Sequence, residues 1–153
     1  MSGVITEIWT SPHGRDPMVG HEEIQAIAGV GLEGDRYAQP QGSESKSRNG
    51  PDRELTLIEQ EQLDWLQAEH GIELTPEAAR RNLVTRGITL NELVGRTFNI
   101  GAVQVEGMRL CQPCKPLAED LGFDFVNLMM DRSGLNCRSV NSGTIHVGDA
   151  VGH

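Results

Sequence analysis

Short apolar runs, several of them alternating with polar residues, are spread along the chain and are separated by glycine and proline. Such runs, bounded by turn residues, predict β-strands. We expect strands at residues 4–9, 54–58, 97–100, 103–110, 144–147 and 150–151, with a further apolar run at 24–30. Gly101 and the pair Gly148-Asp149 each separate two of these runs, which indicates sharp turns between neighbouring strands.

Helical patterns are few and short. Residues 59–69 place Leu63 and Leu66 on one face and acidic residues on the other, which predicts an amphipathic helix that ends at His70-Gly71. Thr75 followed by Pro76 is typical of a helix start, with threonine as the cap and proline in the first turn. Two more short helices are expected at residues 116–121 and 123–130.

The order of these elements indicates the fold class. Strands and helices do not alternate regularly, which disfavours a doubly wound sheet and favours a closed or partly closed barrel. We therefore predict a mainly β protein, a β-barrel with a few short inserted helices. Residues 39–52 are polar and rich in Gly, Ser and Pro, so we expect a flexible surface loop there.

The length and composition fit one domain over residues 1–153. The net charge of −9 argues against binding of nucleic acid, whose phosphates require a basic surface. The sequence contains no apolar run long enough to span a membrane and begins without the pattern of a secretory signal. An odd number of cysteines, three, argues against a disulfide framework, and we expect a cytoplasmic protein.

Basic residues are concentrated in one part of this acidic chain. Residues 80–115 contain six basic and two acidic residues, a local net charge of +4, whereas residues 54–79 contain seven acidic and no basic ones. Eleven of the thirteen basic residues are arginine, whose planar guanidinium binds carboxylate or phosphate through two parallel bonds. This distribution favours a small anionic ligand.

The sequence Cys111-Gln112-Pro113-Cys114-Lys115-Pro116 carries the strongest chemical signal. Two cysteines at this spacing can bind a metal, exchange a disulfide or provide one reactive thiolate. A structural zinc site lacks a second ligand pair, and a thioredoxin-like motif would lie earlier, within a β-α-β pattern. For a single thiolate, Pro116 would place Cys114 at a helix N-terminus, where the helix dipole and Lys115 favour the anion.

Other candidate residues have a structural interpretation of comparable weight. Cys111 and, more strongly, Cys137 fit buried small residues. The glycine-containing loop at residues 31–34 could present backbone N–H groups to an anion, or could be a simple turn between strands. Asp35 fits a structural cap of that turn better than a catalytic acid.

Several motifs in order along the chain resemble landmarks of the MOSC domain, the C-terminal domain of molybdenum cofactor sulfurase, which also occurs in small free-standing bacterial proteins. These motifs are Gly31-Leu32-Glu33-Gly34-Asp35-Arg36, Arg53 ahead of Leu55-Thr56-Leu57-Ile58-Glu59, Arg81-Asn82-Leu83 with Gly87-Ile88, residues 95–101, Cys111 to Cys114, and residues 143–151. The resemblance covers nearly the whole chain and implies a MOSC-type β-barrel.

The resemblance also implies a function. It implies binding of a molybdenum cofactor (molybdopterin), with Cys114 as the metal ligand or as a sulfur carrier. Arg81 and Asn82 would hold the phosphate or the pterin, and Arg36, Arg53, Arg138 and Lys115 are further cofactor-binding candidates. The resemblance also implies binding of pyridoxal phosphate.

The resemblance implies three possible functions. The first is reduction of N-hydroxylated compounds or base analogues with the help of a redox partner protein. The second is a sulfur carrier that holds a persulfide on Cys114, supplied by a sulfur-donor protein, and the third is a non-catalytic module that binds the cofactor. A thiol–disulfide oxidoreductase ranks below these three.

Overall fold

The computed structural model describes residues 2–12, 16–36, 54–113, 121 and 124–152. Its strands are β1 (Ser2–Thr10), β2 (Val19–His21), β3 (Glu23–Ile27), β4 (Gly31–Leu32), β5 (Leu55–Glu59), β6 (Leu83–Arg86), β7 (Thr97–Ile100), β8 (Val103–Leu110), β9 (Leu135–Ser139), β10 (Gly143–His146) and β11 (Ala150–Gly152). The helices are α2 (Gln60–His70), α3 (Pro76–Ala79), the 3-10 helix η3 (Leu90–Leu93) and α5 (Phe125–Leu128).

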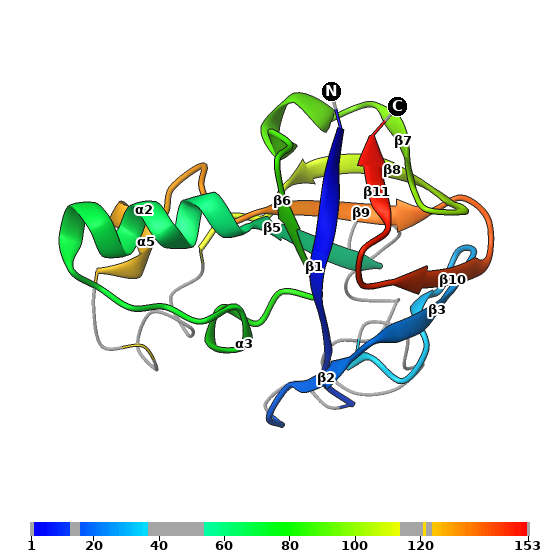
Figure 1. Cartoon of the computed structure of the whole chain (residues 1–153), viewed down its shortest axis with the longest axis horizontal. Helices are drawn as coiled ribbons and strands as arrows, with labels where there is room; N and C mark the ends of the chain where they lie inside the picture. Colours follow the sequence, from blue (N-terminus) through cyan, green and yellow to red (C-terminus); the bar gives the residue numbers. More distant parts are fainter. Residues whose placement is uncertain (1, 13–15, 37–53, 114–120, 122–123, 153) are drawn as a thin grey trace.

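Within the described residues, seven strands close into a barrel in the order β11-β7-β8-β9-β5-β6-β1 (Figure 1). The antiparallel pairing of β1 with β11 completes the ring and brings the two ends of the chain close together. The neighbours β5 and β6 are parallel, and the chain passes from one to the other through α2 and α3. The other barrel pairings are antiparallel. The predicted β-barrel with short inserted helices is confirmed.

A smaller sheet, in the order β10-β3-β4, lies beside the barrel. The chain reaches it from β1 through β2, which pairs with the last residues of β1, and leaves it through the turn from β10 to β11. That turn contains Gly148, whose backbone has a positive φ of 96°. This small sheet therefore places residues 31–36 beside the end of β1.

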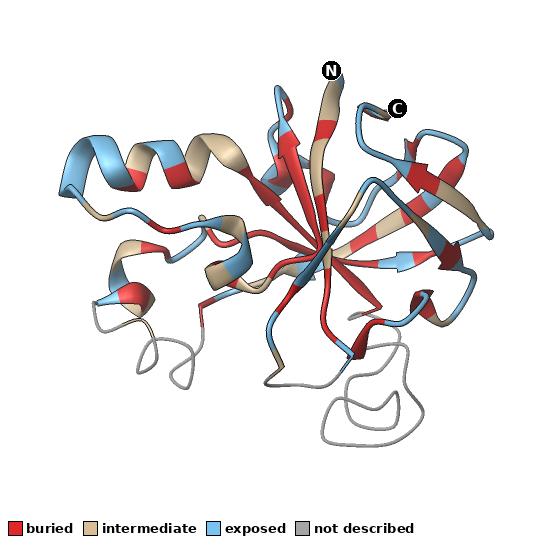
Figure 2. Cartoon of the chain, turned by 60° about the horizontal axis from the view of Figure 1, so that its bottom comes forward, coloured by how far each residue is buried: buried red, intermediate tan, exposed pale blue. Residues whose placement is uncertain are grey.

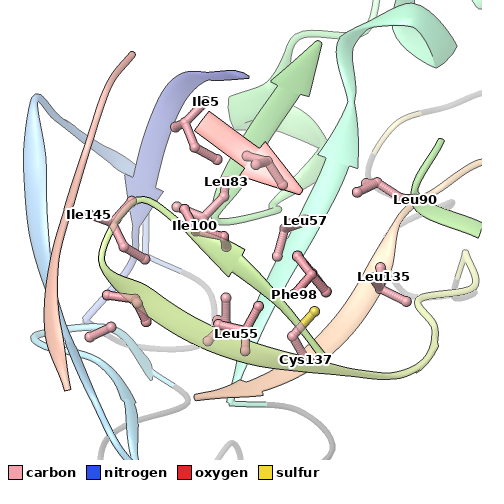
Figure 3. Packing of buried hydrophobic residues seen from close by; sticks show 14 of the residues in the cluster. Ile5, Leu55, Leu57, Leu83, Leu90, Phe98, Ile100, Leu135, Cys137 and Ile145 are labelled. Carbon is pink, nitrogen blue, oxygen red and sulfur yellow. The ribbon is translucent and has the colours of Figure 1, made fainter. Parts of the chain in front are cut away.

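The core of the barrel is built from the inward-facing residues of its strands (Figure 3). Leu55 and Leu57 of β5, Leu135 and Cys137 of β9, and Phe98 of β7 belong to this cluster and are almost completely buried. Because side chains alternate across a strand, Thr56 and Ile58 of β5 point to the outside of the barrel.

Helices cover part of that outer face. A second cluster joins Ile58 and Val84, on the outside of β5 and β6, to Leu63 and Leu66 of α2 and to Phe125 of α5. The opposite side of α2 is exposed (Figure 2). None of the helices in the described part of the chain has the length and hydrophobicity needed to cross a bilayer.

The local signals in the sequence agree with the structure in most places. Thr75 caps α3 by accepting a bond from the backbone N–H of Ala78 (3.2 Å), and α2 ends where Gly71 adopts a left-handed backbone with φ 65°. The expected helix over 123–130 is limited to the four residues of α5. The expected loop at 39–52 lies outside the described residues, as does most of the expected helix at 116–121.

The sequence did not predict the strands β2, β4, β6 and β9 or the 3-10 helix η3. β9 contains only two apolar residues, Leu135 and Cys137, which are too few to give a clear alternating pattern. η3 follows Thr89 and consists of only one turn, which gives too few positions for a periodic signal.

The junction between β5 and α2 carries a buried carboxylate, Glu59. Its Oε2 accepts the backbone N–H of Leu90 in η3 (3.0 Å), and its Oε1 accepts the Gln62 side chain (3.3 Å). Burial disfavours the charged form and raises the pKa of Glu59 above its ordinary value of 4.5, and the bond from Leu90 offsets part of this effect. Glu59 therefore connects η3 to β5 at an electrostatic cost.

We predict that this cost makes stability depend on pH through Glu59. Where the folded protein still holds the proton and the unfolded chain has lost it, stability falls as pH rises, from about the ordinary value of 4.5 up through the raised pKa. Glu59→Gln lacks the carboxyl group that takes up and releases this proton. Its free energy of unfolding relative to the wild type should therefore increase across that window, as measured by urea denaturation at several pH values.

The exposed Glu69 provides the control, because Glu69→Gln removes the same charge from the solvent side of α2. A difference between Glu59→Gln and the wild type that stays constant from acid to neutral pH would contradict the prediction.

Candidate functional site

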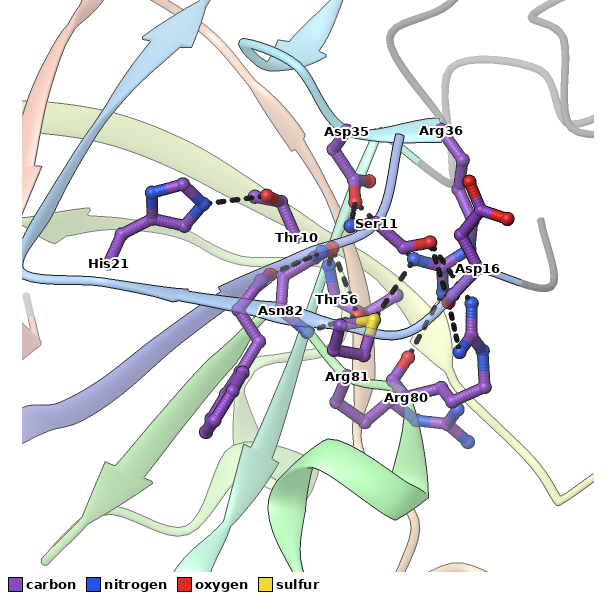
Figure 4. A network of polar contacts seen from close by, with 12 residues as sticks. Thr10, Ser11, Asp16, His21, Asp35, Arg36, Thr56, Arg80, Arg81 and Asn82 are labelled. Carbon is purple, nitrogen blue, oxygen red and sulfur yellow. Dashed lines mark hydrogen bonds and ion pairs between the residues drawn. The ribbon is translucent and has the colours of Figure 1, made fainter. Parts of the chain in front are cut away.

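Polar residues from three separate segments meet where β1 ends and β6 begins (Figure 4). Ser11 follows β1, Asp35 and Arg36 follow β4, and residues 80–82 lie between α3 and β6. Most of these side chains are buried. The structure thus brings together three of the predicted site residues, namely Arg36, Arg81 and Asn82.

Asn82 is completely buried and connects β1 to β5. Its Oδ1 accepts the backbone N–H of Thr56 (3.0 Å) and the hydroxyl of the same residue (3.2 Å). Its Nδ2 donates to the carbonyl of Trp9 (3.0 Å), and its own carbonyl accepts the Trp9 N–H (2.7 Å). These bonds fix the start of β6, and the role of Asn82 toward a cofactor stays a prediction.

Arg36 is buried with its charge compensated. One guanidinium nitrogen lies 3.3 Å from Oδ1 of Asp35, and the other donates to the carbonyl of Arg80 (3.1 Å). Oδ1 of Asp35, itself inaccessible to solvent, also accepts the backbone N–H of Ser11 (3.0 Å). Asp35 and Arg36 together attach the end of the small sheet to the barrel, which agrees with the structural interpretation of Asp35.

Arg80 ends α3 with a left-handed backbone of φ 60°, which is uncommon for a residue with a side chain. Its guanidinium donates to the carbonyl of Asp16 (2.8 Å) and to the hydroxyl of Ser11 (3.3 Å). The reversal at Arg80 turns the chain from α3 toward β6, so that Arg80 and Arg81 point in different directions (Figure 4).

Arg81 differs from Arg36 in the groups that it contacts. Its side chain is buried, with 6% of its surface exposed. Nε donates to the carbonyl of Ser133 (2.7 Å) and one terminal nitrogen donates to the carbonyl of Ala79 (3.1 Å). Among the described residues no carboxylate forms an ion pair with Arg81. No described residue accepts the other three of its five N–H donors.

The backbone partner of Arg81 connects it to the cysteine motif. The hydroxyl of Ser133 donates to the carbonyl of Cys111 (2.5 Å), and the backbone N–H of Cys111 donates to the carbonyl of Gly134 (2.8 Å). Residues 133–134 therefore contact both Arg81 and the first residue of the motif. Cys111 is half-buried rather than buried.

The other cysteines have different positions. Cys137 is completely buried in the barrel core, as expected, and burial raises the pKa of its thiol far above the ordinary value. It therefore stays protonated and serves packing. Cys114 lies outside the described residues, as do the predicted cofactor-binding residues Lys115 and Arg53.

Arg138 is not part of the polar cluster. It lies on the outer side of β9, its side chain is 45% exposed, and its Nε donates to Oε1 of Glu106 on the neighbouring strand β8 (2.6 Å). Its role as a cofactor-binding residue stays a prediction, without support from its contacts.

The loop at residues 31–34 is organised as a turn. The backbone N–H groups of Glu33 and Asp35 donate to the carbonyls of Gln25 and Leu32. A Cβ at Gly31 would lie 2.5 Å from the Glu54 carbonyl oxygen, so glycine is required there for the close passage of two chain segments. These contacts favour the simple turn over the anion-binding loop.

Nothing in the sequence marks Thr56, Arg80 or Ser133 individually as site residues. Serine and threonine at these positions gave no signal, because their importance depends on partners 22 to 52 residues away in the chain. In the described part of the chain, no three His, Cys, Asp or Glu side chains come together as a metal site.

The structure is a small β-barrel with helices on one outer face. A buried arginine, Arg81, is connected through Ser133 to the start of the cysteine motif. Residues 44–152 match the MOSC domain, and the chain belongs to the MOSC domain family, which is associated with binding of the molybdenum cofactor. This confirms the MOSC family membership that the sequence motifs predicted.

Solved structures show the same fold. The YuaD protein from Bacillus subtilis superimposes with a TM-score of 0.83 at 15% sequence identity, over 99% of this chain and 94% of that one. YiiM from Escherichia coli gives 0.68 at 21% identity, over 99% and 69%. YiiM from Geobacillus stearothermophilus gives 0.62 at 17% identity, over 98% and 72%. A search of curated proteins found no match to this chain.

We predict that Asn82→Ala destabilises the protein strongly. The substitution leaves the buried Thr56 N–H and the part-buried Trp9 carbonyl without their Asn82 partner, which should cost about 3 kcal/mol of unfolding free energy. Urea denaturation measures this loss.

Asn99→Ala, on the exposed side of β7, provides the control and should change stability by less than about 0.5 kcal/mol. Equal effects of the two substitutions would show that Asn82 does not connect the strands.

Proposed function

We propose that this protein binds a molybdenum cofactor through Arg81 and Cys114 and uses it to reduce N-hydroxylated compounds or base analogues. Arg81 binds the phosphate of the cofactor, and the thiolate of Cys114 is the metal ligand. The observation that carries the proposal is the buried guanidinium of Arg81, which has donors available and no carboxylate partner among the described residues.

The energetics of burial support an anionic ligand at Arg81. A buried charge is costly unless an opposite charge or several hydrogen bonds compensate it. Arg36, in the same cluster, has such a partner in Asp35 at 3.3 Å. Arg81 has two backbone carbonyls instead, and a phosphate would provide the missing negative charge through bidentate bonds.

The chemistry of the nearby groups fits a pterin cofactor with a phosphate and a sulfur-bound metal. Arg81 supplies the cationic fork for the phosphate, and Ser133 connects it to Cys111, where the cysteine motif begins. Thiolate is a soft ligand and suits a soft metal centre. The motif continues through Gln112 and Pro113 to Cys114, which the family resemblance assigns as the ligand.

When bound, the cofactor supplies a two-electron redox centre. The overall reaction takes R–NHOH with two electrons and two protons to R–NH₂ and water, so the N–O bond breaks and the oxygen leaves as water. A redox partner protein supplies the electrons. In this proposal Arg81 holds and orients the cofactor, and Asn82 keeps the backbone of Arg81 in place.

The proposal predicts that Arg81→Gln loses the cofactor. Without the charged fork, affinity should fall about 10- to 100-fold, since hydrogen bonds to charged groups contribute about 1.5–3 kcal/mol. The measurement is molybdenum and pterin content per chain, after expression in a host that makes the cofactor. Arg81→Lys keeps the charge but not the fork and should give an intermediate content.

The matched control is Arg86→Gln, at the end of β6, where the side chain is half exposed and pairs with Asp64 on α2 (3.3 Å). It should retain wild-type molybdenum content. Circular dichroism of each variant verifies folding. Wild-type content in folded Arg81→Gln would refute the assignment of Arg81.

Cys114→Ala separates the activities that the family resemblance allows. Under the proposal, this variant loses reduction of a hydroxylamino base when supplied with reductant. A persulfide found on Cys114 of wild-type protein that contains no molybdenum would favour the sulfur carrier. Molybdenum with no reduction of any hydroxylamino substrate would favour a non-catalytic cofactor-binding module.

A further inference from the structure

Asn136, in the middle of β9, has a buried side-chain amide that no described residue hydrogen-bonds. Its neighbours Leu135 and Cys137 face the barrel core, so Asn136 points to the outer side of the strand. Only 1% of its surface is exposed. No described residue hydrogen-bonds either its Oδ1 or its Nδ2.

Asn136 lies beside the residues of the candidate site. In the pairing of β5 with β9 it is directly opposite Thr56, whose hydroxyl and backbone N–H bind Asn82. The turn that precedes β9 contains the Ser133 carbonyl that accepts Nε of Arg81 and the Gly134 carbonyl that accepts the N–H of Cys111. One short segment thus connects the free amide, the buried guanidinium and the start of the cysteine motif.

An unpartnered buried amide is unusual and costly. The group offers two N–H donors and two acceptor lone pairs, and nearly all buried polar side chains are hydrogen-bonded. An apolar side chain of the same shape would avoid the cost. A partner with one donor and one acceptor side by side would satisfy Oδ1 and Nδ2 together.

We infer that Asn136 is a specificity-determining residue that binds the heterocyclic ring of the ligand through a cyclic amide edge. Oδ1 accepts the ring N–H, and Nδ2 donates to the adjacent ring carbonyl, in the paired geometry by which asparagine binds adenine in DNA. The pyrimidinone ring of a pterin has such an edge. This inference rests on the proposed function, and it adds recognition of the ring to the binding of the phosphate by Arg81.

The test compares two fluorescent pterins, 6-hydroxymethylpterin and its N3-methylated analogue, in which a methyl group replaces the ring N–H. By fluorescence titration, the wild-type protein should bind the first about tenfold more tightly, or better, because the analogue leaves Oδ1 of Asn136 unpaired. Asn136→Leu should bind the two pterins with about equal affinity. Asn99→Leu, the same change on the exposed side of β7, should keep the wild-type preference.

Unfolding in urea gives a second readout. Asn136→Leu should be at least as stable as the wild type, because the substitution removes two unpartnered polar atoms. A clear loss of stability would show that the amide already has partners in the free protein and would overturn the inference. So would a wild-type protein that binds neither pterin, or that binds both equally, or a preference that survives in Asn136→Leu.

These outcomes can be told apart from failure of the proposed function. If Arg81→Gln loses molybdenum while Asn136→Leu keeps the preference between the pterins, the cofactor site stands and the role of Asn136 is wrong.

Discussion

The side chain of Asn82 is the contact on which the arrangement of the site depends. It binds the backbones of β1 and β5 at the point where β6 enters between them, and it does so within a completely buried environment. The parallel pairing of β5 and β6 has no hairpin to set its register, because two helices separate the strands in sequence. The bonds of Asn82 therefore fix where β6 begins. The residue before it, Arg81, is then held in the interior and contacts the turn that precedes β9.

The two buried arginines of the cluster differ in how their charges are compensated. Arg36 and Asp35 form a compensated pair that attaches the small sheet to the barrel. Arg81 follows Arg80, whose carbonyl accepts a hydrogen bond from Arg36. Among the described residues, the guanidinium of Arg81 donates only to carbonyl oxygens. A chain with a net charge of −9 could readily place a carboxylate there. Under the proposed function, the cofactor phosphate supplies the negative charge that no described carboxylate gives to Arg81.

Local signals in the sequence were sufficient for much of the fold. The turns at Gly101 and Gly148, the cap at Thr75 and the end of α2 at Gly71 depend on the backbone preferences of single residues, and the structure contains all of them. β9 could not be predicted, because only Leu135 and Cys137 of its five residues are apolar, which is too few for a clear alternating pattern. In the site, the sequence indicated a basic stretch at residues 80–115, and the family resemblance placed Arg81 ahead of Arg36 and Arg138. The sequence could not reveal the distinction that Arg36 has a carboxylate partner and that Arg138 is exposed. That distinction depends on contacts between distant segments.

The central claim is that the guanidinium of Arg81 is a binding site for an anion. The most direct measurement is the unfolding free energy of the cofactor-free protein at increasing concentrations of inorganic phosphate, with chloride added to keep the ionic strength constant. Phosphate that binds only the folded wild type should stabilise it by RT ln(1 + [L]/Kd), about 2.7 kcal/mol at a hundredfold excess over Kd, and should leave Arg81→Gln unchanged. Equal stabilisation of both proteins, or none of either, would contradict the account.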